Sequence, residues 1–228
     1  HFCVGAKAFD AERLQSKTAY VMDLSGPVGD CAVAAPTLIT FSAEVVGKAA
    51  HAGFAPEDGV HAIQVAAAAV ANLPSGRWGD VTVNVGTISG GRATNIVPDS
   101  CTVTGEIRAL CHQDALDRLN EIHSEFVEQA QAVDAKLNFN HTIHITGYRV
   151  DTDAPVAQRF RRACEAVGVS PRFTDTYGGS DCNILSAHGI QGLVVATAMN
   201  NCHAVSEYTT VEELCKAGRL AQALMEKQ

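Results

Sequence analysis

One repeating pattern of apolar residues constrains the fold more than any other feature of this sequence. Four segments alternate, fully or partly, between apolar and polar residues, as strands with one covered face do. Two others repeat apolar residues at three- and four-residue steps, as amphipathic helices do. The strand segments are residues 37–45, 81–86, 95–110 and 137–145, and the helix segments are residues 58–72 and 112–132. Their order, strand-helix-strand-strand-helix-strand, predicts a split βαβ sandwich with both helices on one face of the sheet.

The segments on either side of this pattern predict a second domain of a different kind. Its elements are strands at residues 18–26 and 191–197 and helices at residues 5–17 and 156–167. The strands are short apolar runs, typical of a buried parallel sheet. Because Ala34-Ala35-Pro36 indicates a hinge, we predict that residues 1–35 and 147–228 form an α/β domain. Residues 36–146 then form an inserted α+β domain of the ferredoxin-like βαββαβ kind.

Composition and charge narrow the classes of function. The chain has 228 residues and a net charge of −8, and its one basic cluster, Arg159, Arg161 and Arg162, lies on a single predicted helix. Nucleic acid is therefore not an expected partner, because phosphate binding needs a concentrated basic surface. No apolar run reaches the roughly 20 residues of a membrane helix. The eight cysteines are scattered without a CxxC pair, so we expect a reducing, cytoplasmic setting.

Two loops present polar side chains between predicted elements. His51 lies at the mouth of a strand-to-helix loop that is rich in Gly and Pro, where functional side chains are often presented. The alternative is a histidine satisfied within its own loop. Gly179 and Ser180 precede another predicted helix, where the serine either caps the helix or helps its free N–H groups to bind an anion. Asp23 lies near the carboxyl end of the predicted strand at residues 18–26 and is either a ligand at the sheet edge or a loop cap.

Four phrases, in this order, resemble one family of enzymes. They are residues 48–63, residues 94–108 with Thr-Asn-Ile-Val-Pro and Gly-Glu-Ile-Arg, residues 178–181 with Gly-Gly-Ser-Asp, and residues 201–208 with Asn-Cys-His-Ala-Val-Ser-Glu-Tyr. The family is that of the co-catalytic zinc aminopeptidases and dipeptidases, which includes peptidase T, carnosinases, aminoacylase and succinyl-diaminopimelate desuccinylase. Peptidase T-like members are the most similar. The chain resembles the C-terminal part of such a protein, with residues 36–146 as its lid domain.

The resemblance implies a metal site of which this chain supplies a share. In the family, two zinc ions polarise the scissile carbonyl and activate the attacking water. Asp23 and His203 match two of the metal ligands. The catalytic Glu-Glu pair and the other ligands have no counterpart here and are expected before His1. Two ligands alone should bind zinc weakly, so we expect an incomplete metal site in these 228 residues.

The resemblance also implies roles around the substrate. His51 matches a lid histidine that reaches a neighbouring active site, usually across a homodimer, and stabilises the oxyanion. Asn95 and Arg108 match lid positions that bind the substrate's C-terminal carboxylate, although Arg108 could instead be a solvated charge at a strand edge. Gly179 and Ser180 match a loop that touches the substrate backbone.

Three functions of different classes remain in view. The first is zinc-dependent hydrolysis of an amide bond in small peptides or N-acyl amino acids. The second is an inactive truncated or processed fragment that only dimerises through its lid. The third is a thiol enzyme that uses Cys202 and His203, which is disfavoured because adjacent side chains usually point apart.

Overall fold

The computed structural model describes residues 3–226, which form two compact units. Unit 1 comprises residues up to Pro36 together with those from Ile145 onward, and unit 2 comprises residues 37–144. Unit 2 is therefore inserted into unit 1 in the chain. Each unit has its own sheet and its own cluster of buried apolar residues.

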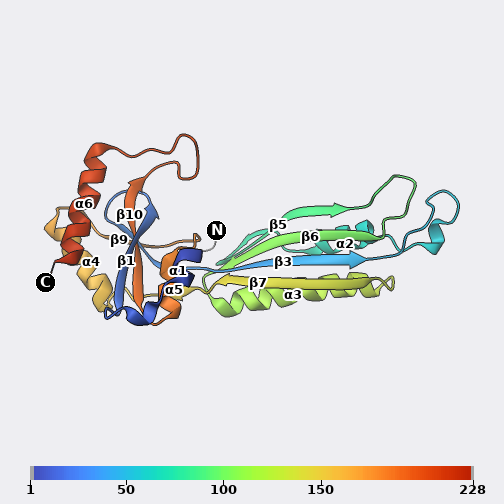
Figure 1. The fold of residues 1–228 in the computed structure, drawn as a ribbon, viewed down its shortest axis with the longest axis horizontal. Coiled ribbons are helices and arrows are strands. Elements are labelled where there is room, and N and C mark those ends of the chain that lie inside the picture. The colour runs from blue at the N-terminus through green and yellow to red at the C-terminus, as the bar shows by residue number, and fades with distance from the viewer. Residues whose placement is uncertain (1–2, 227–228) are drawn as a thin grey trace. The chain divides into compact units, whose positions relative to one another are not determined.

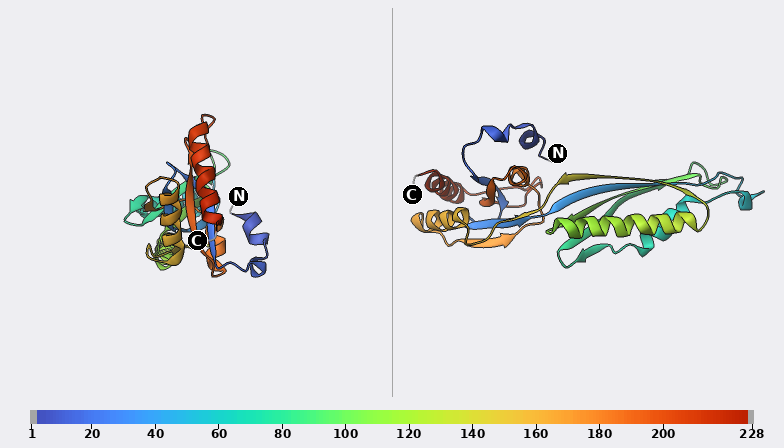
Figure 2. Two further views of the ribbon diagram at one scale, coloured as in Figure 1. Left: turned by 90° about the vertical axis from the view of Figure 1, so that its left-hand side faces the viewer. Right: turned by 90° about the horizontal axis from the view of Figure 1, so that it is seen from below.

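Unit 2 is an antiparallel sheet covered by helices. Its strands are β3 (Thr37–Val46), β4 (Gly76–Trp78), β5 (Val81–Gly90), β6 (Ser100–Ala109) and β7 (Lys136–Ile145), and its helices are α2 (Ala62–Asn72) and α3 (His112–Gln131). The strand order is β4-β5-β6-β3-β7. Both helices lie along the same face of the sheet (Figures 1 and 2). Apart from the short β4, this is the predicted βαββαβ arrangement, which is confirmed.

The alternation of residues explains why one face of this sheet is covered. Along β3, apolar side chains at every second position are buried, and the polar side chains between them are partly exposed. Phe41 stacks on Phe139 with ring centroids 6.0 Å apart. A Cβ at Gly105 would lie 2.3 Å from the Phe41 ring, so only glycine fits beneath it. The covered face thus forms the core of unit 2, and the other face is open.

Unit 1 is a mixed sheet with helices. Its strands are β1 (Thr18–Ser25), β2 (Asp30–Ala35), β8 (Tyr148–Arg149), β9 (Arg172–Asp175) and β10 (Gln191–Met199), and its helices are α1 (Val4–Ala8), α4 (Pro155–Ala166), α5 (Asp181–Ala187) and α6 (Val211–Met225). The order is β1-β10-β2-β8, and β9 also pairs with β2. The strands β1 and β10 run parallel, whereas β10 and β2 run antiparallel. The predicted α/β class is confirmed.

Four expected boundaries were wrong. Residues 5–17 form α1 and a separate 3-10 turn, Ala11–Arg13, because Asp10 caps a new turn and neither element has a buried residue. The helix after His51 begins at Ala62, since the residues before it form a 3-10 turn and a β-bridge. The third strand of the sandwich begins at Ser100 instead of residue 95. The fully buried β2 was not expected as a strand, and its last two residues, Ala34 and Ala35, fall in the expected hinge.

Within residues 3–226, none of the helices has both the length and the apolar character that crossing a membrane requires.

Candidate functional site

Asp23 and His203 lie at the carboxyl ends of two neighbouring strands. Asp23 is an exposed residue near the end of β1, and His203 follows the end of β10 by four residues. The two strands pair in parallel, and Gly26 N–H donates to the Met199 carbonyl oxygen at 3.3 Å where they end. Carboxyl ends of parallel strands are where ligands collect in α/β sheets. The fold therefore brings the segments that carry both predicted metal ligands to one edge.

The loop that holds His203 is closed on itself and has an uncommon backbone. Asn200 and Tyr208 pair across its base, and the backbone N–H of His203 donates to Glu207 Oε2 at 2.9 Å. Asn201 and His203 adopt positive φ angles of 53° and 68°. Non-glycine residues seldom adopt this left-handed conformation, and it concentrates at functional sites. The imidazole itself is exposed and has no hydrogen-bond partner among residues 3–226.

The chemistry of Asp23 and His203 fits zinc, but only in part. Carboxylate oxygen and imidazole nitrogen are ordinary zinc donors, and a catalytic zinc usually has three protein ligands. Among the residues that the structure describes, there is no group of three or more His, Cys, Asp or Glu side chains that could hold a metal ion. These two residues therefore amount to a share of a site, and their role as ligands stays a prediction.

His51 belongs to a loop of unit 2 that is fastened on both sides. His51 pairs with Ile96 in a β-bridge, and Ala52 N–H donates to the Asn95 carbonyl oxygen at 3.0 Å. Lys48 and Val60 exchange backbone hydrogen bonds of 3.0 and 2.9 Å at the base of the loop. The structure thus brings two predicted substrate residues, His51 and Asn95, into adjoining segments, and both are exposed.

The imidazole of His51 is held from within its own loop. The backbone N–H of Gly53 donates to Nδ1 at 3.1 Å. The ring of Phe54 lies against the imidazole, with centroids 4.3 Å apart and planes inclined by 33°. Phe54 is itself 86% exposed. His51 is therefore satisfied within its own loop at Nδ1, as the alternative interpretation expected. Its Nε2 has no hydrogen-bond partner within residues 3–226.

A hollow of about 550 Å³ borders the segment that contains Asn95. It is lined by residues from two segments of unit 2, most of them small or apolar, together with one histidine and one arginine: His61, Ile63, Gly90, Gly91, Arg92, Ala93, Thr94, Ile96 and Pro98. Arg92, which is among these lining residues, is paired with Asp99 at 2.8 Å. The hollow is large enough for a small peptide side chain.

Arg108 lies near the opposite end of the sheet from His51 and Asn95. It stands near the end of β6, whereas the His51 and Asn95 segments adjoin the beginning of that strand. At about 3.3 Å per residue, the eight steps from Ser100 to Arg108 span about 25 Å. Arg108 Nε donates to Glu106 Oε1 at 2.6 Å, and both side chains are about one-third exposed. One small ligand could not touch all three predicted residues within one unit 2.

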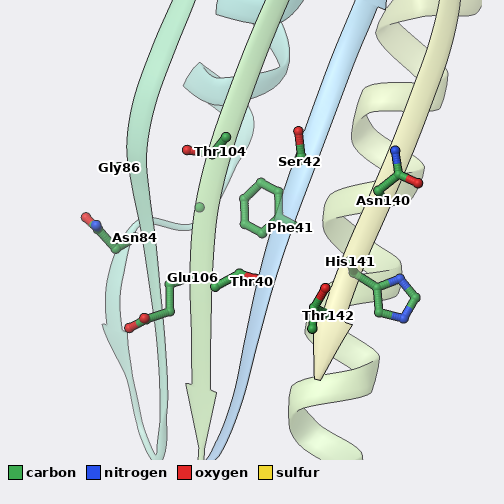
Figure 3. A pocket seen from close by; sticks show the side chains of 11 residues that line it. Thr40, Phe41, Ser42, Asn84, Gly86, Thr104, Glu106, Asn140, His141 and Thr142 are labelled. Carbon is green, nitrogen blue, oxygen red and sulfur yellow. The ribbon is translucent and has the colours of Figure 1, made fainter. Parts of the chain in front are cut away.

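Between these two ends, the open face of the sheet is polar. Figure 3 shows side chains of Thr40, Ser42, Thr104, Glu106 and Thr142 on the strands around a hollow of about 350 Å³. The hollow is broad and shallow, and its polar side chains come from β3, β5, β6 and β7. None of the residues named in the sequence analysis as candidates lines it.

Ser180 is the N-cap of α5, and Asn183 completes a capping box. Ser180 Oγ accepts from Cys182 N–H at 3.2 Å, and Ser180 N–H donates to Asn183 Oδ1 at 3.0 Å. A Cβ at Gly179 would lie 2.2 Å from Ile145 Cδ1, so a larger residue would require the end of the Ile145 side chain to shift. The capping interpretation of Ser180 is therefore correct, and a contact with substrate remains a prediction for both residues.

Asn183 is a residue that sequence reasoning missed. Its Nδ2 donates to the carbonyl oxygens of Pro36 at 3.1 Å and of Thr146 at 2.9 Å, and the residue is 1% exposed. Pro36 is the last residue of unit 1 before the insertion, and Thr146 lies just after it. The spacing Ser-x-x-Asn at the start of a helix was a signal for the cap, but nothing in the sequence indicated the two carbonyl partners.

The cysteines give no support to thiol chemistry. All eight are free, and four of them are buried: Cys31, Cys101, Cys164 and Cys182. Burial raises the pKa of Cys164 and of Cys182 to about 11, so both remain protonated thiols at neutral pH. No hydrogen bond joins Cys202 to His203 in the described part of the chain, and Cys202 is only partly exposed.

The sequence is similar to one described protein family and to known proteins. Residues 33–134 match the family described as the peptidase dimerisation domain of the M20 group. The uncharacterized protein YqjE of Bacillus subtilis is 31% identical over 225 residues, which are 98% of this chain and 61% of that protein. The chain thus spans about three fifths of the length of this relative.

Two solved structures share the fold closely. The aminopeptidase PepT from Bacillus cereus is 36% identical with a TM-score of 0.92, over 97% of this chain and 60% of that one. A tripeptidase from Staphylococcus aureus is 27% identical with a TM-score of 0.93, over 97% of this chain and 59% of that one. The match extends over both units, so the likeness is not limited to the dimerisation domain.

Proposed function

We propose that this chain, which carries the M20 dimerisation domain and is homologous to peptidase T, takes part in zinc-dependent hydrolysis of an amide bond in small peptides or N-acyl amino acids. The homology supports a peptidase-type hydrolase. The metal, the substrate class and the assignment of residues are parts of the proposal. Because the chain spans about three fifths of these relatives, further ligands and the general base are expected from outside its 228 residues.

The adjacent carboxyl ends of β1 and β10 carry the proposal. Asp23 and His203 would hold zinc there together with ligands from elsewhere. Bound zinc supplies Lewis-acid polarisation of the scissile carbonyl and activation of water. The exposed imidazole of His203, on a backbone held in an uncommon conformation, is consistent with a ligand that no partner within residues 3–226 occupies.

The residues of unit 2 would bind and orient the substrate. His51 would donate a hydrogen bond to the developing oxyanion, and a preorganised donor of this kind is among the larger contributions to catalysis. Asn95 and Arg108 would bind carboxylate groups, for which the planar guanidinium of Arg108 is well suited. Gly179 and Ser180 of unit 1 would contact the substrate backbone.

The separation of His51 from Arg108 supports a homodimer. Because about 25 Å of β6 separates the two ends of the sheet, a single substrate can use His51 of one copy and Arg108 of another, but not both from the same unit 2. The match to a dimerisation domain agrees with this arrangement. Strand β7 lies at one edge of the sheet and could pair with a second copy.

The 228-residue chain alone is expected to be inactive, so the hydrolysis assays that test the proposal combine it with the missing part of the family fold. We expect release of an amino acid from a tripeptide or an N-acetyl amino acid to require zinc, to stop with a chelator, and to be lost in His203→Ala. The matched control is His188→Ala, which removes another exposed histidine of unit 1. Hydrolysis that is insensitive to the chelator would contradict the proposal.

A dimerising fragment without activity is the second candidate. The observation that favours it is the share of the relatives' length that the chain covers, 61% of YqjE and 60% of PepT. In that case the chain would form dimers in solution, as measured by light scattering, and show no hydrolysis with zinc. Addition of the missing part of the family fold as a separate polypeptide would then distinguish an incomplete enzyme from an inactive one.

A further inference from the structure

We propose that Gly53 and Phe54 are positioning residues that fix His51 as a hydrogen-bond donor through Nε2. The inference deepens the proposed function and rests on it for its purpose, because it assigns the donor role of His51 to one atom. It concerns the conformation and the proton of a single imidazole, so it can be examined in the chain as it stands.

The turn after His51 folds back onto that residue with three hydrogen bonds. The carbonyl oxygen of His51 accepts from the N–H groups of Phe54 at 3.2 Å and Ala55 at 3.0 Å. The imidazole Nδ1 accepts from Gly53 N–H at 3.1 Å. Because His51 also pairs with Ile96 outside the turn, both its backbone and its ring are fixed.

The bond from Gly53 decides which ring nitrogen carries the proton. A backbone N–H can only donate, so Nδ1 must be the acceptor. A neutral imidazole has one donor nitrogen and one acceptor nitrogen, and the proton therefore lies on Nε2. Nε2 has no hydrogen-bond partner within residues 3–226 and the residue is exposed, so this N–H is available to an incoming oxygen atom.

Phe54 restricts the ring in the remaining direction. Its ring centroid lies 4.3 Å from that of His51, at an inclination of 33°. With 86% of its surface exposed, Phe54 contributes little to the core of unit 2. Its contact with the imidazole is therefore a local one within the loop. The hydrogen bond fixes the tautomer, and the tilted Phe54 ring in contact with the imidazole limits its rotation.

The test is nuclear magnetic resonance of the nitrogen-15-labelled 228-residue chain. Spectra are recorded at about pH 8.5, roughly two units above the ordinary imidazole pKa of about 6.5, and the His51 signals are assigned by their loss in His51→Gln. We expect a single tautomer with the proton on Nε2 and ring-current shifts of the His51 carbon-bound protons. In Phe54→Ala, those shifts should be lost, and Phe54→Tyr should restore them.

The control variant is Gly53→Ala, which keeps the N–H donor. A Cβ at this position would lie 3.6 Å from the nearest atom, His51 Cε1, which is an ordinary contact. The tautomer should therefore be unchanged in Gly53→Ala and become a mixture in Gly53→Pro, which lacks the donor. An Nδ1-protonated or mixed imidazole in the unsubstituted chain overturns the proposal, whatever the variants do. His51 shifts that persist in Phe54→Ala overturn the role of Phe54.

These outcomes are separate from those of the proposed function. Chelator-insensitive hydrolysis would remove the metal mechanism and leave the Nε2 tautomer intact. A wrong tautomer would remove the positioning role of Gly53 and Phe54 while zinc-dependent hydrolysis could stand.

Discussion

The loops that carry His51 and His203 present exposed imidazoles in opposite ways. The His51 ring accepts a hydrogen bond at Nδ1 and lies against the tilted ring of Phe54, so its orientation is set before any ligand arrives. In the His203 loop the backbone is fixed instead: the N–H donates to Glu207, and φ is 68°. The His203 ring has no hydrogen-bond partner within residues 3–226.

The difference teaches what each histidine can do. A ring with one nitrogen already occupied offers a single, directed hydrogen bond, which suits a donor to a developing charge. A ring that is held only through its backbone can turn toward a metal ion, whose coordination then fixes the ring. These two ways of holding a ring agree with the proposed roles, in which His51 contacts the substrate and His203 binds the metal.

The largest expected difference between the two histidines is in how much each contributes to zinc affinity. In His203→Ala we expect zinc affinity of the 228-residue chain to fall at least about 100-fold, since even the partners of metal ligands are worth 10- to 100-fold. In His51→Ala it should stay within about twofold, because that ring lies on another unit and lacks the strand-end setting. Titration calorimetry measures both. Equal losses would end the distinction, and a tight isotherm with two equivalents in the unsubstituted chain would contradict the expected incomplete site.

Substitution of Gly47 should loosen the His51 loop and leave the His203 loop intact. A Cβ at Gly47 would lie 2.1 Å from the Val60 carbonyl oxygen, a backbone atom at the base of the loop. We expect Gly47→Ala to lower the free energy of unfolding by about 2–3 kcal/mol, as overpacking does. The Lys48 and Val60 amides should lose protection from hydrogen exchange.

Gly53→Ala is the control for this prediction, because its nearest contacts would be ordinary ones. Chemical denaturation of the two variants measures the difference. If both variants unfolded at the same denaturant concentration, the closed base of the loop would not be what holds His51.

A fall in pH should slightly destabilise the start of α6, to which the His203 loop leads. The loop leads to Thr210, the N-cap of α6, and Lys216 pairs with Glu212 at 3.0 Å in the first turns. The hydrogen bond and charge of Lys216 lower the pKa of Glu212. A lowered pKa stabilises the folded state above the unfolded pKa, and that contribution is lost as the pH falls through the folded value. The effect is small because these side chains are exposed and screened.

Carboxyl carbon shifts followed during a pH titration measure this prediction. Glu212 should titrate below an ordinary glutamate, and Lys216→Met should return it to the ordinary range. An unchanged titration in Lys216→Met would show that the pair does not fix the start of α6.

The sequence predicted unit 2 better than unit 1, for a physical reason. The β3 segment has one covered face, and its alternation of residues carries that fact directly. Strand β2 is buried along its whole length, so Cys31 to Ala35 show no alternation and were not recognised as a strand. The late start of α2 depends on the pairing of Val60 with Lys48, a contact that no local propensity contains.

The candidate site likewise has features that the sequence could predict and features that it could not. The phrases around His51 and His203 could be recognised because their residue types are unusual and ordered. The fixed ring of His51 could not be predicted, since it arises from a turn whose hydrogen bonds return to the residue that begins it. Likewise, the Ser180 cap follows a local rule, whereas the partners of Asn183 come from about 37 and 147 residues away.

The side chain of Asn183 also bears on how such a chain could evolve. One amide nitrogen bonds Pro36 O at 3.1 Å and Thr146 O at 2.9 Å, so the two carbonyls are no farther apart than these bonds laid end to end. Roughly two residues, at about 3.3–3.6 Å each, would bridge that gap. A recombination event could therefore delete or exchange the whole inserted unit and leave the host sheet's strand order as it was.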